Sequence, residues 1–277
     1  MKKRTLLAIM WKDLKVALQN KGVLIPVIVV PVILFVVIPW VLTIIPALAA
    51  SSLSNIQSME SQIANLLTKM PVVMQNQLAG HSATDQMVIF ILVYGFAPMF
   101  LILPLMTASV LAADSFAGEK ERKTMEALLY TPTSDRELFV AKLLGPWVAS
   151  IVISILSFIL YTAMVDLSGW ISMKAILLPN LMWIALVFWV APATAGLSLV
   201  IMVFASAKAQ GFQDAYQTGG MVVLPVLALV YGQIGGVMYF TVGFVMILGL
   251  AFWILLAVLL WLASKKFNRE QLMLKTR

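Results

Sequence analysis

Long apolar runs separated by short polar connections dominate the sequence. A helix needs about 20 consecutive apolar residues to cross the hydrocarbon core of a bilayer. The last apolar run, 215–263, is long enough for two such helices and is interrupted by a glycine-rich stretch at 232–236. Divided there, the pattern predicts an all-α membrane protein with six spans, at 23–46, 87–113, 143–165, 176–205, 215–231 and 237–263.

The connections complete the predicted organisation, with residues 1–22 before the first span and a tail at 264–277. The first apolar run has 24 residues. The apolar core of a cleavable signal peptide has about 7–15 residues, so we expect a membrane anchor. The longest connection, 47–86, carries apolar residues at helical spacing, which predicts a short amphipathic helix on the membrane surface, ended by Pro71. The residues at that spacing are Ile56, Met59, Ile63, Leu66, Leu67 and Met70.

Composition agrees with this pattern. Hydrophobic residues make up 62% of the 277 residues and charged residues 11%, whereas a soluble domain has about 25% charged residues. The chain has no cysteine, and its one histidine, His81, lacks neighbours at the spacing of metal ligands. We therefore expect no metal site.

The basic residues indicate which connections face the cytoplasm. Of the 19 Lys and Arg residues, 17 precede the first span, follow the last one, or lie between spans two and three or four and five. Lys and Arg accumulate on the cytoplasmic side, so both termini are expected there, in a multi-pass protein of the cytoplasmic (inner) membrane. The net charge of +7 is then explained by contact with anionic lipid, and we expect no nucleic-acid partner.

The predicted spans contain no Asp, Glu, Lys, Arg or His. Charged groups at membrane depth are costly and usually mark ion or proton pathways. Their absence argues against a carrier coupled to protons or sodium ions, and against an intramembrane hydrolase. No catalytic residue is expected in this chain.

Prolines interrupt the first two spans. A proline removes one backbone donor and kinks a helix, and neighbouring helices in a membrane satisfy the carbonyl that is freed. The kinks indicate either a moving interface or ordinary irregular packing. The prolines are Pro26, Pro31, Pro39, Pro46, Pro98 and Pro104.

Two further patterns concern packing. The small residues of 191–196 predict close helix approach rather than a substrate site. Tryptophans near the ends of predicted spans are expected at the membrane interfaces. These are Trp40, Trp147, Trp170, Trp183 and Trp261.

The segment 112–138, between the second and third spans, is the most informative part of the chain. It is rich in charges of both signs, and Met125, Leu128 and Leu129 form an apolar strip at helical spacing. This pattern predicts an amphipathic helix that ends before Pro132. Such a helix either docks in a groove of a soluble partner or is solvated, with internal Glu–Lys pairs.

The same segment resembles the loop between the second and third spans of ABC-2 type permeases, the membrane subunits of bacterial and archaeal ABC exporters. Lys123 stands where many relatives have glycine. The segment before the first span resembles the elbow helix of the same family. The matching loop positions are Glu119, Lys120, Glu121, Arg122, Thr124, Glu126, Leu128, Leu129, Pro132 and Lys142, and the elbow positions are Trp11, Lys12, Leu14, Lys15, Asn20 and Lys21.

The resemblance implies a six-span, type V exporter-like permease fold with an amphipathic elbow helix and a cytoplasmic coupling helix. It implies that the loop positions and the elbow contact a separate ABC ATP-binding subunit, which holds ATP and Mg²⁺. It also implies that two permease copies, identical or different, enclose one pathway in the lipid bilayer. The elbow would rest on lipid through a stripe of apolar residues. The stripe consists of Leu7, Met10, Leu14, Ala17 and Leu18.

The chain itself lacks a phosphate-binding loop. Gly118 and Lys123-Thr124 match part of one, but the second glycine is missing and no strand precedes them. No cofactor is therefore expected in this chain, and it is not expected to be an enzyme. The competing interpretations are a secondary carrier or channel, and a membrane scaffold or sensor subunit that transports nothing.

Overall fold

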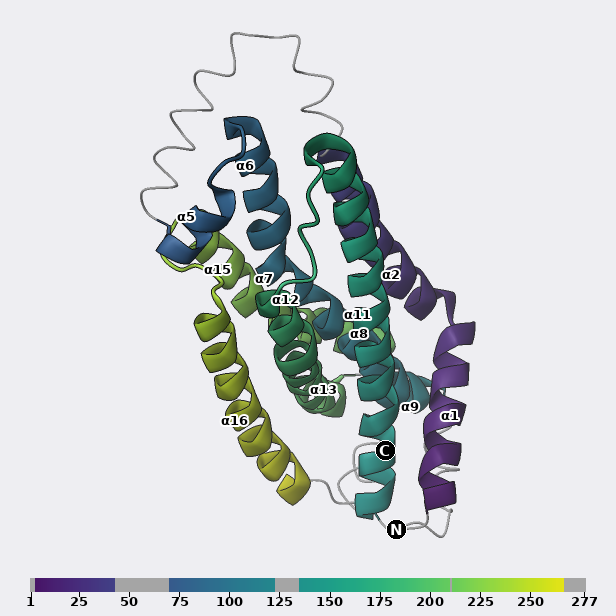
Figure 1. The fold of residues 1–277 in the computed structure, drawn as a ribbon. Helices are drawn as coiled ribbons and strands as arrows, with labels where there is room; N and C mark the ends of the chain where they lie inside the picture. The colour runs from purple at the N-terminus through teal and green to yellow at the C-terminus, as the bar shows by residue number, and fades with distance from the viewer. Residues whose placement is uncertain (1–2, 43–69, 123–134, 210, 267–277) are drawn as a thin grey trace.

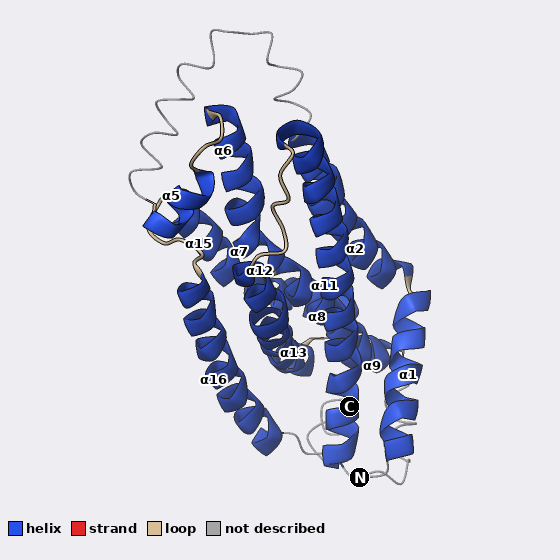
Figure 2. Cartoon of the chain, in the orientation of Figure 1, coloured by secondary structure: helices blue, strands red, loops and turns tan. Residues whose placement is uncertain are grey.

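The computed structural model describes residues 3–42, 70–122, 135–209 and 211–266, and all regular structure in these ranges is helical (Figure 2). Six helices there are long and apolar enough to cross a membrane, which confirms the predicted number. They are Lys21–Leu42, Asp85–Glu121, Phe139–Ile171, Leu181–Lys208, Phe212–Ile234 and Val242–Ala263. We refer to them as spans 1 to 6.

Several spans consist of α-helical pieces joined by a short π-helical or 3₁₀-helical segment, labelled η. Before span 1 comes α1 (Lys3–Gln19), and span 1 itself is α2 (Lys21–Val32) with η1 (Ile33–Val37). The outer connection contains α5 (Val72–Leu78). Span 2 comprises α6 (Ala83–Ile89), η2 (Phe90–Gly95), α7 (Phe96–Phe100), α8 (Ile102–Ala113), η3 (Asp114–Gly118) and α9 (Glu119–Glu121).

The second half of the chain is divided in the same way. Span 3 lies within one long helix, α11 (Asp135–Met173). Span 4 comprises α12 (Leu181–Ala185), η4 (Leu186–Val190) and α13 (Ala191–Lys208). Span 5 comprises α14 (Phe212–Gly219), η5 (Gly220–Val222) and α15 (Val223–Ile234), and span 6 lies within α16 (Val242–Lys266).

Spans 2 and 4 form the centre of the bundle. In their most apolar stretches 72% and 67% of the residues are buried, against 17% in spans 5 and 6. Helices α8 and α13 pack along their length. Ser198 donates a hydrogen bond to the Leu105 carbonyl at 2.8 Å, and its oxygen lies 2.5 Å from the Ser109 hydroxyl. Small side chains allow this approach, and the stretch 191–196 does serve packing.

Helix α1 does not use its apolar stripe to contact lipid. It lies beside α11 (Figure 1), where a Cβ atom at Gly145 would come within 3.3 Å of Met10 Cγ. Ala17 is buried and Leu14 packs against the same cluster. The predicted lipid-facing orientation is therefore wrong for these residues, because the helix satisfies its apolar face against span 3. The side chains of Leu7 and Leu18 lie outside the described part of the chain.

Span 2 continues beyond its predicted end at residue 113 and reaches Glu121, so it includes Asp114 and Glu119. Helix α11 likewise starts at Asp135 rather than at 143, and it passes Asp166 to end at Met173. The charged residues do not break these helices, because each of the carboxylates has internal donors. Asp166 Oδ1, for example, accepts from the backbone N–H of Leu177 at 3.0 Å.

Most of the outer connection, 43–69, lies outside the described residues, and with it the amphipathic helix predicted there. Its last predicted position, Met70, is buried together with Met74 and Leu78 of α5. Helix α5 thus begins after Pro71 and packs its apolar side on the core of the bundle.

An aromatic cluster packs the spans against one another in the half of the bundle that contains η2 and α12. Trp183 of span 4 is fully buried, with Phe158 of span 3 stacked on it at 5.7 Å between ring centroids and Phe100 of span 2 edge-on at 5.4 Å. The predicted interfacial position of Trp183 is therefore wrong. Its indole N–H has an acceptor inside the protein, the Val93 carbonyl at 2.7 Å, so the residue has no need of the polar membrane surface.

Candidate functional site

A buried carboxylate near the end of span 2 holds two lysines from distant parts of the chain. Glu119 Oε1 lies 2.5 Å from the ammonium of Lys12 in α1, and Glu119 Oε2 is paired with the ammonium of Lys142 in α11. The Glu119 side chain is 6% exposed and that of Lys142 is 1% exposed, whereas Lys12 is 43% exposed. Lys142 also donates to the Ser115 carbonyl at 2.7 Å.

Asp114, one and a half turns earlier in span 2, forms the second buried contact. Its Oδ1 accepts from Arg122 Nη1 at 3.0 Å and from Asn20 Nδ2 at 3.0 Å. Asn20 caps α2 at the same time, because its Oδ1 accepts from the Gly22 N–H at 3.0 Å. The hydrogen bond to Asp114 raises the pKa of Arg122 above its usual range, so this guanidinium stays charged at all physiological pH values.

The same end of span 2 also holds the start of span 5. The Phe212 N–H, at the first position of α14, donates to Glu121 Oε2 at 2.9 Å, and Lys120 donates to the Ala209 carbonyl at 2.8 Å. A carboxylate at a helix N-terminus is favourable because the free N–H groups and the helix dipole attract it. Gly211 leaves room for it, since a Cβ atom there would come within 2.7 Å of Glu121 Oε2.

These contacts form one structural unit, which we call the ionic layer. Its charged members alternate in sign, and within the described residues each buried carboxylate faces at least one cation. The layer joins α1 and the starts of spans 1, 3 and 5 to the end of span 2. Its members are Lys12, Asn20, Asp114, Glu119, Lys120, Glu121, Arg122 and Lys142.

Comparison with known proteins assigns the chain to a family. A family model described as ABC-2 family transporter protein matches residues 7–275. The chain belongs to the ABC-2 transporter family. No curated protein and no solved structure matches the chain. The match spans all six membrane helices and the ionic layer. The protein is therefore a multi-pass membrane component of a transporter, and the matched region folds as the six-helix bundle described above.

The predicted loop positions of this ABC-2 permease fall into three groups. Glu119 is buried and held by the chain's own lysines, so its carboxylate is not presented to a soluble partner. Glu121 and Arg122 are exposed at the edge of the ionic layer. Lys120 and Lys142 belong to the ionic layer with Glu119. The other positions lie in 123–134, outside the described residues. They are Thr124, Glu126, Leu128, Leu129 and Pro132.

The predicted elbow positions lie on both sides of α1. Leu14 faces the bundle and Lys12 reaches Glu119, while Lys15 is exposed and Trp11 is 67% exposed. The elbow is therefore attached to span 2 by one ion pair and to span 3 by apolar packing.

The sequence pattern did not reveal Asp114 as a site residue, and it treated Asn20 and Lys142 only as family positions. Asp114 and Lys142 look like the polar ends of spans, because each stands next to an apolar run. The usable signal was the several charges of opposite sign near these two residues in the sequence. A membrane helix tolerates charged residues only when they are paired, so these charges indicate ion pairs.

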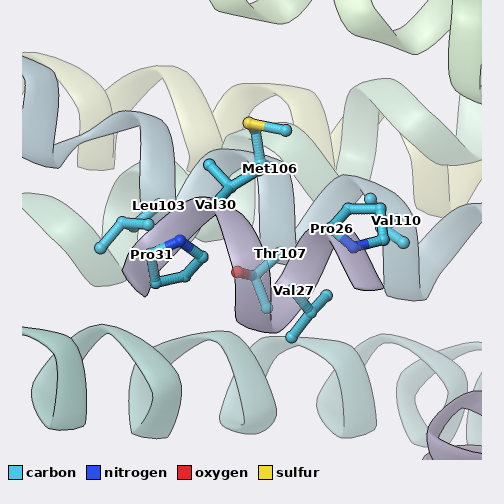
Figure 3. A pocket seen from close by; sticks show the side chains of 8 residues that line it. All are labelled: Pro26, Val27, Val30, Pro31, Leu103, Met106, Thr107 and Val110. Carbon is cyan, nitrogen blue, oxygen red and sulfur yellow. The ribbon is translucent and has the colours of Figure 1, made fainter. Parts of the chain in front are cut away.

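A crevice between α2 and α8 is lined by side chains of both helices (Figure 3). It holds about 10 Å³, room for a single water molecule, and is far smaller than a pocket for an organic ligand, which needs about 300 Å³ or more. Its lining is Pro26, Val27, Val30, Pro31, Leu103, Met106, Thr107 and Val110. In the described part of the chain no group of three or more His, Cys, Asp and Glu side chains could hold a metal ion.

Burial predicts that the two lysines of Glu119 contribute unequally to stability. Glu119→Gln leaves the buried Lys142 without its carboxylate, and breaking a buried pair costs about 3–5 kcal/mol. Lys12→Ala removes only a half-exposed pair, which is worth about 0–1 kcal/mol. Thermal unfolding in detergent measures both. In the double variant Glu119→Gln, Lys142→Met the buried charge is gone, and part of the loss should be recovered. Equal destabilisation by Glu119→Gln and Lys12→Ala would contradict this assignment.

Proposed function

We propose that this ABC-2 family protein is the permease subunit of an ATP-binding cassette exporter whose ATPase is a separate chain. The observation that carries the proposal is that the described residues on either side of 123–134 lead into the ionic layer. Arg122, directly before this segment, pairs with Asp114, and Lys142 of α11, the helix that follows it, pairs with Glu119. A partner that binds this segment pulls on spans 2 and 3 together.

The ionic layer gives this pull a mechanical path. Force applied at Arg122 reaches span 1 through Asp114 and Asn20, and force applied at Glu121 reaches the first turn of span 5. The Asp114 side chain is only 2% exposed, and a buried carboxylate left without its cation would be strongly destabilised, so its contact with Arg122 resists separation. The layer would therefore move as one body when the ATPase subunits close around ATP and Mg²⁺ and separate after hydrolysis.

The exposed side of span 5 supports a second permease copy. Gln213, Gln217 and Thr218 of α14 are exposed, and only 17% of the span's apolar stretch is buried. Polar side chains facing lipid are costly, so a second copy or a water-filled pathway is expected against this side. Closed two-fold assemblies are the most common oligomers, and the partner is an identical or a related permease.

The described residues do not favour an ion-coupled carrier. The ionisable groups that span 2 brings towards the membrane, Asp114 and Glu119, are held by cations of the same chain. A proton-relay carboxylate has to be free to change its charge, whereas these two are fixed by ion pairs. The transported molecule is proposed to be amphipathic or apolar, because the exposed residues of span 5 are mixed. They are polar in α14, with Gln213, Gln217 and the single acidic residue Asp214, and apolar further along, with Met221 and Leu224.

Coupling to the ATPase is tested at the exposed edge of the layer and in the segment that follows it. Glu121→Ala removes the cap of α14, and Glu126→Ala changes the proposed docking segment. Each is expected to leave expression intact and to lower substrate-stimulated ATP hydrolysis of the reconstituted complex about fivefold or more, which corresponds to a coupling free energy of about 1 kcal/mol. Asp85→Asn, at the opposite end of span 2, is the matched control. Normal stimulation in the double variant Glu121→Ala, Glu126→Ala would refute the coupling role.

The sidedness follows from the basic residues, with both termini and residues 206–214 in the cytoplasm and residues 47–86 outside. The chain has no native cysteine, so single cysteines report on it directly. A cysteine at Ser58 should react with a membrane-impermeant thiol reagent in intact cells. A cysteine at Ala207, which is exposed beside Lys208, should react only after permeabilisation. The reverse pattern would overturn the proposed orientation.

A further inference from the structure

Pro98 leaves span 2 short of one backbone donor at a defined place. In an α-helix the Tyr94 carbonyl accepts from the N–H of residue 98, and in the π-helical spacing of η2 the Val93 carbonyl does. Residue 98 is proline and has no N–H to give. In the packed bundle Val93 and Tyr94 are buried, so the carbonyl that lacks this N–H needs a donor from another span.

Side chains from three other spans donate to this carbonyl and to its neighbours. Tyr161 of span 3 donates its hydroxyl to the Leu92 carbonyl, and Trp183 of span 4 donates to the Val93 carbonyl. Gln233 of span 5 donates Nε2 to the Tyr94 carbonyl at 2.5 Å. Three consecutive carbonyls of span 2 thus hold three spans.

The three donors are not equally fixed. Tyr161 and Trp183 are fully buried in the aromatic cluster, where their rings stack on Phe96 and Phe158. Gln233 comes from a peripheral span, and it follows the half-buried Gly232 in the last turn of α15.

The surroundings of Gln233 indicate that its hydrogen bond to the Tyr94 carbonyl can be broken at low cost. Its side chain is buried while its neighbours Tyr231 and Ile234 are 71% and 66% exposed. Its second amide atom, Oε1, is buried with no hydrogen-bond partner in the described residues. A buried acceptor without a donor is destabilising. Exposure to water would satisfy both halves of the amide, so the closed contact lies close in free energy to an open one.

We infer that Gln233 is a latch that closes the outward end of spans 2 and 5, and that transport requires its release. This positioning role rests on the proposed transport function. When the amide holds the Tyr94 carbonyl, the end of span 5 lies against η2 and α7. When the ionic layer moves the start of span 5, the latch opens at the other end of the same helix and water replaces the lost hydrogen bond.

The latch is tested by the outward accessibility of a cysteine at Val93, a buried position next to the bonded carbonyl. The full chain is expressed with its partner ATPase in cells, depleted of ATP and treated with a membrane-impermeant thiol reagent. Gln233→Met keeps the length of the side chain and removes the donor, and it is expected to raise the labelling rate at least tenfold. Gln86→Met is the matched control, because Gln86 also donates to a backbone carbonyl of the outer region, that of His81 at 3.1 Å. It is expected to leave the rate unchanged.

A second substitution separates a latch from a general packing role. Pro98→Ala returns an N–H to the Tyr94 carbonyl, so in that background Gln233→Met is expected to change the labelling rate less than twofold. A packing defect would have the same effect in both backgrounds, and that result, or equal rates for the parent and Gln233→Met, would overturn the inference. Gln233→Asn, which keeps the amide but is too short to reach, gives the same expected increase if the Met variant does not fold. Since labelling needs no ATP hydrolysis, its outcome is independent of whether the proposed coupling to the ATPase holds.

Discussion

The carboxylate of Glu119 is the contact on which the half of the bundle around the ionic layer depends. It neutralises Lys142, which is buried in span 3, and it also holds Lys12 of α1. A buried ammonium without a partner is strongly destabilised. Spans 2 and 3 therefore have to remain in contact when the helix that carries Glu119 moves. The elbow helix is attached to the same carboxylate by a more exposed bond. One side chain therefore sets the relative position of three helices that are far apart in the sequence.

Buried polar groups in a membrane protein need partners, and this rule accounts for the polar contacts at both ends of span 2. At the Glu121 end the groups are charges, and Lys12, Lys142 and Arg122 pair with them. Towards the other end Pro98 offers no N–H, and the Val93 and Tyr94 carbonyls accept from Trp183 and Gln233. These polar contacts add to the aromatic cluster and to the small residues that pack against span 4.

The sequence was sufficient for the number and rough position of the spans, because an uncharged apolar run of about 20 residues is typical of a membrane helix and rare in soluble domains. The sequence was not sufficient where the end of a helix or the burial of a side chain depends on a polar partner in another span. Asp114 and Glu119 look like the start of a loop, but partners from other spans let the helix run through them. Glu119 and Lys12 are 107 residues apart, and no local pattern reports such a pair. Trp183 was misplaced for the same reason, since its acceptor, the Val93 carbonyl, belongs to another span.

Two proposed functions of the chain, receiving force from an ATPase and enclosing a pathway, both require an assembly larger than one bundle. Six helices that pack at about 8–10 Å leave little internal space, and the described crevice holds about 10 Å³. The most direct measurement is the mass of the intact complex purified in mild detergent and analysed without dissociation. Two permease chains with two ATPase subunits are expected. A stable particle with a single permease chain, or one that binds no ATPase, would contradict the proposed exporter.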